Sequence, residues 1–333
     1  MSKALAVTIP HQLAPILACV PAVIAAAGDE ASYRFVRYFV ETIRNQDTRQ
    51  AYARAVRDFL FWCEAKGIAL EQIEPVGVSA YVEALSGERA ASTVKQHVAA
   101  IRSLFDWLVT GGIVPFNPAS SVRTPRISYR NGKTPILDAD ECRLLLDSID
   151  VTEISGLRDR ALIGVMVYSF ARIGATLKLN RGDYRVSGKK ATFRLHEKGG
   201  KFNEVPAHHL AEQYLDEYLA AAKMIHAKKD MPLFLRMDRK RKLRKKWDKS
   251  PDEIRLDRRE ALAMVKRRAK RAGLPDDLCN HTFRGTGITT YLKNGGDRSK
   301  AAQIAGHASE KTTALYDRRN QEVERSEIER VII

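Results

Sequence analysis

The stretch CNHTFRGTGITTYLKNGGDRSKAAQIAGHASEKTTALYDRR, residues 279–319, places two histidines, an arginine and a tyrosine in helical sequence that glycines interrupt. His281 and Arg284 are three residues apart, a spacing that puts both side chains on one face of a helix. The pair Gly306-His307 is predicted to open a second helix, and Tyr316 follows the histidine by nine residues. Each residue taken singly fits a packing or surface role, so their joint spacing is the informative feature.

The composition of the whole chain narrows the kind of partner. The 333 residues, 44% of them hydrophobic, are enough for two domains with cores of their own. Lysine and arginine number 56 against 40 acids, and this excess favours nucleic acid as the partner over the plainer explanation of solubility. The four cysteines form no C-x-x-C pair, so neither a zinc ribbon nor a disulfide framework is indicated, and a reducing cytoplasm fits best.

Residues 1–30 are predicted to be an N-terminal extension. Their apolar stretch QLAPILACVPAVIAAAG resembles the apolar region of a secretion signal, but Pro10, Pro15 and Pro21 interrupt it. No apolar span of about 18 residues exists to cross a bilayer. We therefore expect a short helical extension that packs on the body or on a neighbouring subunit, and no membrane partner.

Residues 31–121 are predicted to form an all-helical bundle. The segments DTRQAYARAVRDFLFWCEAKG and ASTVKQHVAAIRSLFDWLVTGG each carry an apolar stripe at helical spacing, and Asp47 is the predicted N-cap of the first. A shorter helix, VSAYVEAL, lies between them. The polar faces carry bases that bind phosphates or are simply solvated: Arg49, Arg54, Arg57, Lys95 and Arg102.

Residues 122–135 form a basic linker, because Arg123, Arg126 and Arg130 lie among turn formers without an apolar period. The second domain, residues 136–333, is predicted to be helical except for short strands over residues 184–206, which Gly-containing turns separate. The fold class is therefore mainly α with a small β-meander, in two domains.

Two further basic segments of the second domain are candidates for DNA contact. Residues 236–249 hold nine bases and two acids, which indicates an exposed loop against DNA or a plain solvated loop. The next helix has a capping box, Asp257-x-x-Glu260, and a cationic face that suits a DNA backbone. That face comprises Lys266, Arg267, Arg268, Lys270 and Arg271.

The spacing of the opening stretch resembles the C-terminal signature of the tyrosine recombinases, the phage integrase and Xer-type family. Upstream, ARIGATLKLNRGD resembles the first arginine box of the family and puts Arg172 in the catalytic arginine position. HEKGGKFNEVP is similar to its β-hairpin lysine segment, with Lys198 in the acid position and Lys201 as the alternative. The helical first domain is similar to the core-binding domain of the family, so the resemblance covers most of the chain.

Two positions depart from the family pattern. The acid commonly found three places after the first arginine is Ala175, and the histidine commonly found after the second arginine is Gly285. The first departure removes a group that would orient the arginine or the lysine. We therefore expect the catalytic pocket to be braced differently, without loss of a residue that does chemistry.

The resemblance implies a two-domain DNA clamp that cleaves DNA through a 3′-phosphotyrosyl intermediate. A phosphodiester under attack gains negative charge that two guanidiniums can bind in forked geometry. A tyrosine with a free pKa of about 10 needs a neighbouring base to act near neutrality. The implied roles are Tyr316 as nucleophile, Arg172 and Arg284 as phosphate ligands, His281 as base, His307 as a second phosphate donor and Lys198 as acid. No metal, nucleotide or other cofactor is expected.

The resemblance also implies the partners. We expect the substrate to be double-stranded DNA with inverted-repeat core sites. A homo-tetramer is expected to exchange strands of two such sites through a Holliday junction. The expected location is the cytoplasm, on the bacterial-type nucleoid. Integration, excision or resolution of a mobile element or replicon is the expected outcome. The tail, residues 321–333, is predicted to dock on a neighbouring protomer, with packing in cis as the plainer alternative. The expected DNA contacts are Arg49, Lys95, Arg123, Arg126, Arg130, Lys266 and Arg267.

Two other functions stay open on the sequence alone. A type IB topoisomerase-like enzyme would share the cleavage chemistry but relax supercoils, and the small helical first domain disfavours it. A catalytically silent DNA-binding regulator would keep the basic surfaces, and the intact set of six candidate catalytic residues disfavours it.

Overall fold

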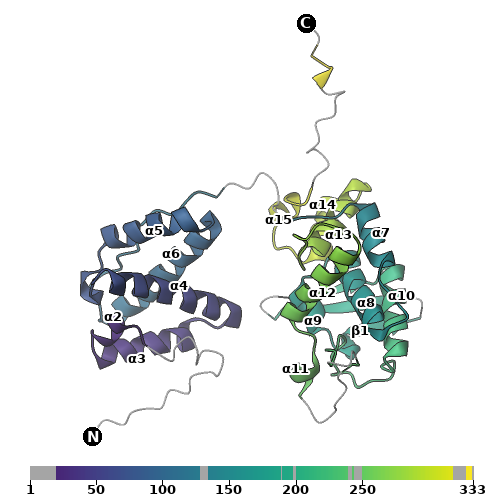
Figure 1. The fold of residues 1–333 in the computed structure, drawn as a ribbon, viewed down its shortest axis with the longest axis horizontal. Coiled ribbons are helices and arrows are strands. Elements are labelled where there is room, and N and C mark those ends of the chain that lie inside the picture. The colour runs from purple at the N-terminus through teal and green to yellow at the C-terminus, as the bar shows by residue number, and fades with distance from the viewer. Residues whose placement is uncertain are drawn as a thin grey trace. The chain divides into compact units, whose positions relative to one another are not determined.

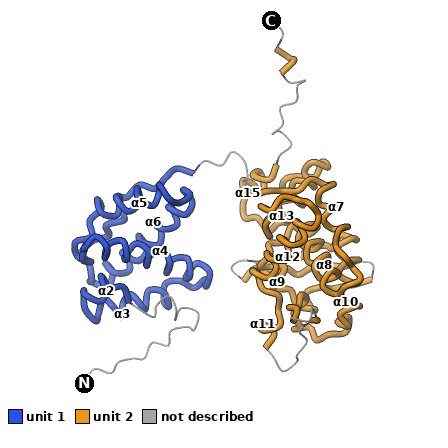
Figure 2. The backbone as a smooth tube through the Cα atoms, in the orientation of Figure 1, with its two compact units in different colours: residues 1–128 blue, residues 129–333 orange. Residues whose placement is uncertain are grey.

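The computed structural model describes residues 20–127, 134–188, 190–197, 200–238, 242–243, 250–317 and 328–331. Lys198, Arg130, most of the basic segment 236–249 and most of the predicted C-terminal tail lie outside the described residues, as does much of the predicted N-terminal extension. The chain divides into two compact units, residues 1–128 and 129–333 (Figure 2). Within the part that the structure describes, no helix has both the length and the apolar character to span a bilayer.

The first unit is a bundle of helices (Figure 1). Its helices are α2 (Ala22–Ala25), α3 (Asp29–Arg37), α4 (Gln46–Ala65), α5 (Pro75–Glu88) and α6 (Ala91–Thr110), with a π-helical turn at Tyr38–Thr42 and a 3-10 turn at Leu70–Gln72. The two long helices, α4 and α6, pack together through their apolar stripes. Phe59 and Phe105 meet edge to face there, with ring centroids 6.4 Å apart and both side chains buried.

The predicted N-cap of α4, Asp47, is wrong. Asn45 caps the helix, and its side-chain oxygen accepts a hydrogen bond of 3.0 Å from the backbone N–H of Thr48. Asp47 lies in the first turn, where a carboxylate also suits the positive end of the helix dipole. Asn and Asp are both favoured at the N-cap position, so the sequence alone did not show which of Asn45 and Asp47 caps the helix.

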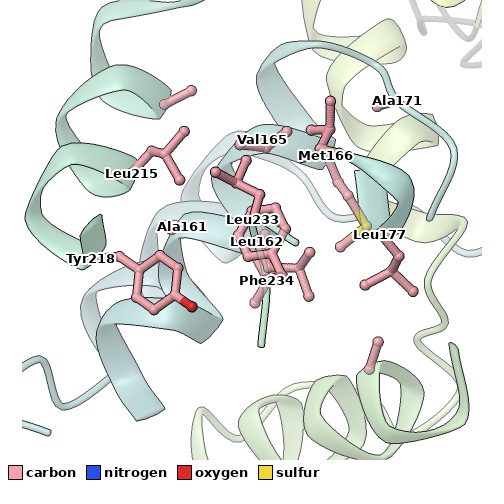
Figure 3. Close-up of a cluster of buried hydrophobic side chains, with 14 of the residues drawn as sticks. Ala161, Leu162, Val165, Met166, Ala171, Leu177, Leu215, Tyr218, Leu233 and Phe234 are labelled. Carbon is pink, nitrogen blue, oxygen red and sulfur yellow. The ribbon is translucent and has the colours of Figure 1, made fainter. Parts of the chain in front are cut away.

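The second unit surrounds one long apolar helix. Its helices are α7 (Ala139–Asp147), α8 (Ile154–Tyr168), α9 (Ile173–Lys178), α10 (His209–Ala221), α11 (Pro251–Ile254), α12 (Arg258–Arg271), α13 (Thr282–Lys293), α14 (Arg298–Ala305) and α15 (Glu310–Ala314). The core side chains of α8, among them Leu162, Val165 and Met166, cluster with Leu233 and Phe234 (Figure 3). Burial of each such side chain stabilises the fold by about 1.5–3 kcal/mol.

The predicted β-meander is present as a three-stranded antiparallel sheet in the order β1-β2-β3. Its strands are β1 (Tyr184–Ser187), β2 (Lys190–His196) and β3 (Phe202–Pro206). Alternate residues of β2, including Phe193 and Leu195, are fully buried against the core, as the period of a half-buried strand requires. The predicted fold class, mainly α with a small β-meander, is confirmed.

The helix α13 lies very close to α8. A Cβ atom at Gly287 would lie only 2.1 Å from the carbonyl oxygen of Val167, so this contact admits glycine alone. The close packing holds α13 against the end of α8, and Arg172, the N-cap of α9, lies four residues after α8 ends. The packing of α13 on α8 therefore places Arg284 beside the turn that leads from α8 to Arg172.

Candidate active site

Five segments of the second unit bring the candidate residues together. Arg172 is the N-cap of α9, and His281 is the N-cap of α13. Arg284 follows in the first turn of α13, His307 lies just after α14, and Tyr316 lies just after α15. The hairpin between β2 and β3 contributes Glu197.

Tyr316 lies between the two histidines. Its hydroxyl oxygen is 2.6 Å from Nε2 of His281, and its ring stacks nearly parallel on that of His307, with centroids 6.1 Å apart. The hydroxyl of Thr289 donates a hydrogen bond of 2.9 Å to the Tyr316 carbonyl oxygen. The tyrosine is therefore fixed at both its side chain and its backbone, and the residue is only 8% exposed.

Arg284 is the largest fully buried side chain of the described residues and is 1% exposed. Its terminal nitrogens donate hydrogen bonds to the carbonyl oxygens of Phe170 and Ala305, which link the end of α8 to the end of α14. No described residue bonds its Nε. Burial, with the neighbouring charge of Arg172, lowers the pKa of Arg284 to about 10, so the guanidinium is still charged at neutral pH.

Arg172 is the more accessible of the two arginines. Its side chain is 40% exposed, and it donates a hydrogen bond of 2.5 Å to the carboxylate of Glu197, whose side chain is 10% exposed. Glu197 directly follows β2, and its backbone N–H donates to the carbonyl oxygen of Lys201 at 2.7 Å, which closes the hairpin. Lys201 is exposed, and Lys198 lies outside the described residues.

The electrostatics of the site keep both histidines neutral. Burial first, and then the charges of Arg284 and Arg172, lower the pKa of His281 below its usual range. The same causes lower the pKa of His307 to about 3. Burial raises the pKa of Tyr316, and the two arginines act against that rise. A neutral imidazole beside a protonated tyrosine is the arrangement that general-base catalysis requires.

The prediction that Gly306-His307 opens a helix is wrong. The helix α14 ends at Ala305, and Gly306 caps it in the left-handed conformation with φ 60°. A residue in this conformation stops a helix, because it turns the chain away from the helical path. His307 then points Nδ1 at the hydroxyl of Thr313, 2.8 Å away, which leaves Nε2 for a ligand.

The expected DNA contacts are spread over both units. In the first unit, three of these side chains are exposed: Lys95, Arg123 and Arg126. Arg49 is half-buried, and its Nε donates a hydrogen bond of 2.9 Å to the carbonyl oxygen of Ile43. In the second, Lys266 and Arg267 are exposed on α12, and Lys266 donates to the carbonyl oxygen of Asp276.

The assignment of Arg268 to the cationic face of α12 is wrong. Arg268 is 8% exposed and donates two hydrogen bonds, of 3.0 and 2.8 Å, to one carboxylate oxygen of Asp159 in α8. Arg158 bonds the other oxygen of the same carboxylate. A buried carboxylate needs such partners, and this requirement outweighed the exposed position that the helical pattern favoured.

Sequence reasoning missed Glu197 and Thr313. Glu197 stands next to the predicted lysine, and its place in the chain was the one signal that could have drawn attention to it. Thr313, which is fully buried, lies three residues before Tyr316 in a helix too short for a clear pattern.

Comparison with known proteins identifies the relatives of this chain. The family model of the phage integrase family matches residues 135–322, and that of the phage integrase N-terminal SAM-like domain matches residues 34–112. The tyrosine recombinase XerD of Corynebacterium glutamicum is 31% identical over 288 residues, which cover 83% of this chain and 89% of that protein.

Among the solved structures that share the fold are two tyrosine recombinases. One is the XerH site-specific recombinase bound to its difH substrate before cleavage, with a TM-score of 0.61, 22% identity and coverage of 85% of this chain and 78% of that one. The other is a lambda integrase tetramer bound to a Holliday junction, with a TM-score of 0.63, 17% identity and coverage of 92% and 83%.

Proposed function

Since the chain belongs to the phage integrase family of tyrosine recombinases, we propose that Tyr316 is the nucleophile of a site-specific DNA recombination reaction. The observation that carries this proposal is the 2.6 Å hydrogen bond between the Tyr316 hydroxyl and Nε2 of His281. A nucleophile bonded to a neutral base is activated, because the base removes the proton as attack begins.

The attack forms a bond between the Tyr316 oxygen and the phosphorus of the scissile phosphodiester. The bond from phosphorus to the 5′ oxygen breaks, and a 3′-phosphotyrosyl link results. The hydroxyl proton goes to His281. The energy of the broken ester stays in the new link, so a different 5′ hydroxyl can reverse the step and rejoin the strand without an external energy source.

Arg172 and Arg284 bind the non-bridging oxygens of that phosphate. Their guanidiniums are charged at working pH and offer forked donors, and those donors stabilise the charge that develops during attack. The buried Nε of Arg284, which no described residue bonds, supports this role because a buried donor gains much from an anionic partner. Nε2 of His307 is a further donor to the same phosphate.

The departing 5′ oxygen takes its proton from Lys198, which lies outside the described residues. Support comes from Glu197, the residue directly before it, whose carboxylate contacts Arg172. The hairpin therefore carries Lys198 within one residue of a group that already touches the site.

Binding of the phosphate requires a movement of Tyr316. Arg284 is 1% exposed and Tyr316 is 8% exposed, so a DNA phosphate cannot reach the guanidinium while the tyrosine side chain is in this position. The short helix α15 directly precedes Tyr316 and is the segment whose shift would open the site.

The natural reaction joins two DNA sites. We infer that the two domains clamp double-stranded DNA at inverted-repeat core sites of about 11 base pairs, one helical turn per protomer. Four protomers then exchange strands through a Holliday junction, and the tail docks in trans. The lambda integrase tetramer on such a junction, which shares this fold, supports the assembly. The outcome is integration, excision or resolution of a mobile element or replicon, in the cytoplasm on the nucleoid.

The test is a comparison of the parent protein with Tyr316→Phe, a change that deletes one oxygen and little volume. A nicked DNA substrate, incubated with EDTA, should accumulate a 3′-linked protein adduct with the parent only. DNA affinity, measured by gel shift, should stay the same for both proteins. An adduct formed by the variant would reassign the nucleophile, and cleavage that depends on added magnesium would contradict the metal-free mechanism.

A further inference from the structure

We propose that Glu197 is the positioning residue for Arg172, and that it takes over the task of the acid that Ala175 has replaced. This inference rests on the proposed role of Arg172 as a phosphate ligand. Glu197 itself touches no reacting atom in the proposal. It acts by holding the guanidinium in place.

The helix α9 lacks the acid that the family pattern carries three residues after the first arginine. Arg172 is the N-cap of that helix, and position 175 lies one turn later on the same side. Ala175 is 4% exposed and has no polar group to offer. An arginine with a flexible side chain loses much conformational freedom when it is held in one place, so it needs a partner that fixes it.

Glu197 contacts Arg172 directly. Its Oε2 accepts a hydrogen bond of 2.5 Å from Nη1 of Arg172. The carboxylate is more buried than the arginine, with side-chain exposures of 10% and 40%. The acid is therefore the more buried partner, and the partly exposed guanidinium has further N–H groups that can donate to a phosphate.

Two contacts anchor Glu197 itself, and a third ties its hairpin to α14. The hydrogen bond to Lys201 fixes its backbone at the base of the hairpin. The side-chain amide of Asn203 donates a hydrogen bond of 2.9 Å to the carbonyl oxygen of Ile304, which ties β3 to the end of α14. A Cβ atom at Gly306 would lie 3.4 Å from Oε1 of Glu197, so the carboxylate packs against the helix end that precedes His307.

These contacts place Glu197 where the hairpin, the start of α9 and the end of α14 meet. The other carboxylate oxygen, Oε1, is buried and bonded by no described residue. A buried carboxylate with one strong partner is costly to leave alone, so the pair with Arg172 forms in preference to a solvated arginine. The contact thus ties the hairpin, at Glu197, to the guanidinium of Arg172.

The experiment measures single-turnover cleavage of a nicked substrate by Glu197→Gln. Loss of a charge-assisted hydrogen bond should slow cleavage by about 10- to 100-fold, with DNA affinity unchanged. Glu204→Gln is the matched control, since Glu204 is an exposed hairpin carboxylate paired with Arg185 at 3.4 Å, and it should cleave at the parent rate.

A double-mutant cycle separates positioning from a merely structural role. In the Arg172→Ala background, Glu197→Gln should change the rate by less than about twofold, because its target is gone. An equal loss in both backgrounds, or a parental rate for Glu197→Gln alone, would overturn the proposal. If Arg172→Ala itself cleaves at the parent rate, the proposed function of that arginine fails instead.

A rescue variant tests the exchange of roles directly. Ala175→Glu, added to Glu197→Gln, restores the acid of the family pattern and should recover at least part of the lost rate. Because Ala175 is buried, thermal unfolding must first show that the double variant folds, and Ala175→Asp is the smaller substitute. A folded double variant that recovers none of the lost cleavage rate would contradict the exchange of roles between position 175 and Glu197. The double-mutant cycle tests the positioning role independently of this result.

Discussion

Arg284 donates a hydrogen bond to the carbonyl oxygen of Phe170, a residue whose φ of 54° is left-handed. A bulky residue in this conformation is strained, at a cost of about 1–3 kcal/mol, and such strain survives only where the surroundings enforce it. The turn that Phe170 makes ends α8, aims its carbonyl at Arg284, and brings Arg172 to the start of α9 two residues later. One strained turn therefore helps to position both arginines.

The first prediction concerns Gly287, which packs against this turn. Gly287→Ala would put a Cβ atom 2.1 Å from the Val167 carbonyl oxygen and 2.8 Å from the Phe170 ring, so α13 must shift. We expect a loss of about 1–3 kcal/mol in the free energy of unfolding, measured by urea denaturation, and slower cleavage because Arg284 shifts with the helix. Gly174→Ala in α9, where a Cβ atom meets nothing within 4 Å, is the control and should unfold like the parent or later. If Gly287→Ala and Gly174→Ala are equally stable, α13 can move away from α8 without a loss in the free energy of unfolding, which contradicts this prediction.

The second prediction concerns the pH dependence of cleavage. The neutral form of His281 is the proposed base, and its pKa lies below the ordinary value of about 6.5. The second-order rate constant, which reports the free enzyme, should therefore fall to half of its plateau value at a pH below 6.5. His281→Gln should be slower at every pH, by about 10²–10⁴-fold, and lose this acid limb. His226→Gln, at an exposed position, should keep the parental profile. A half-maximal rate at or above pH 6.5 would contradict the assignment.

The third prediction identifies the general acid. Lys198→Ala should strongly slow cleavage of ordinary DNA, because the 5′ oxygen leaves without a proton. A substrate with sulfur at the 5′ bridging position should restore the rate, since a thiolate leaves unprotonated. Lys201→Ala, measured in parallel, tests the alternative lysine. If the sulfur substrate restores the rate of Lys201→Ala alone, Lys201 is the general acid. If it restores the rate of neither variant, the result points to His307 as the acid.

The fourth prediction concerns the basic linker. Replacing Arg123, Arg126 and Arg130 together with glutamine should weaken binding to any DNA sequence. The slope of log affinity against log salt should become shallower by about 0.9 for each phosphate that the linker no longer neutralises. A control triple variant at exposed positions, Lys66→Gln, Arg143→Gln and Lys228→Gln, removes the same charge and should keep the slope. An unchanged slope in the linker variant would show that these arginines are merely solvated.

The sequence by itself determined the helices, the β-meander and the spacing of the candidate catalytic residues. These features are local, because an apolar stripe, a capping box such as Asp257 and Glu260, or a glycine-bounded strand depends on neighbours within a few residues. The excess of bases predicted nucleic acid as the partner for a similar reason, since net charge needs no fold.

Only the tertiary structure decided which charged groups face each other. Arg268 is absent from the cationic face because Asp159, 109 residues earlier in the chain, supplies a buried partner. Arg172 meets Glu197 across 25 residues, where the sheet and α9 pack on the core around α8. Such pairs form because burial makes an isolated charge costly, and burial is a property of the packed chain that no local pattern contains.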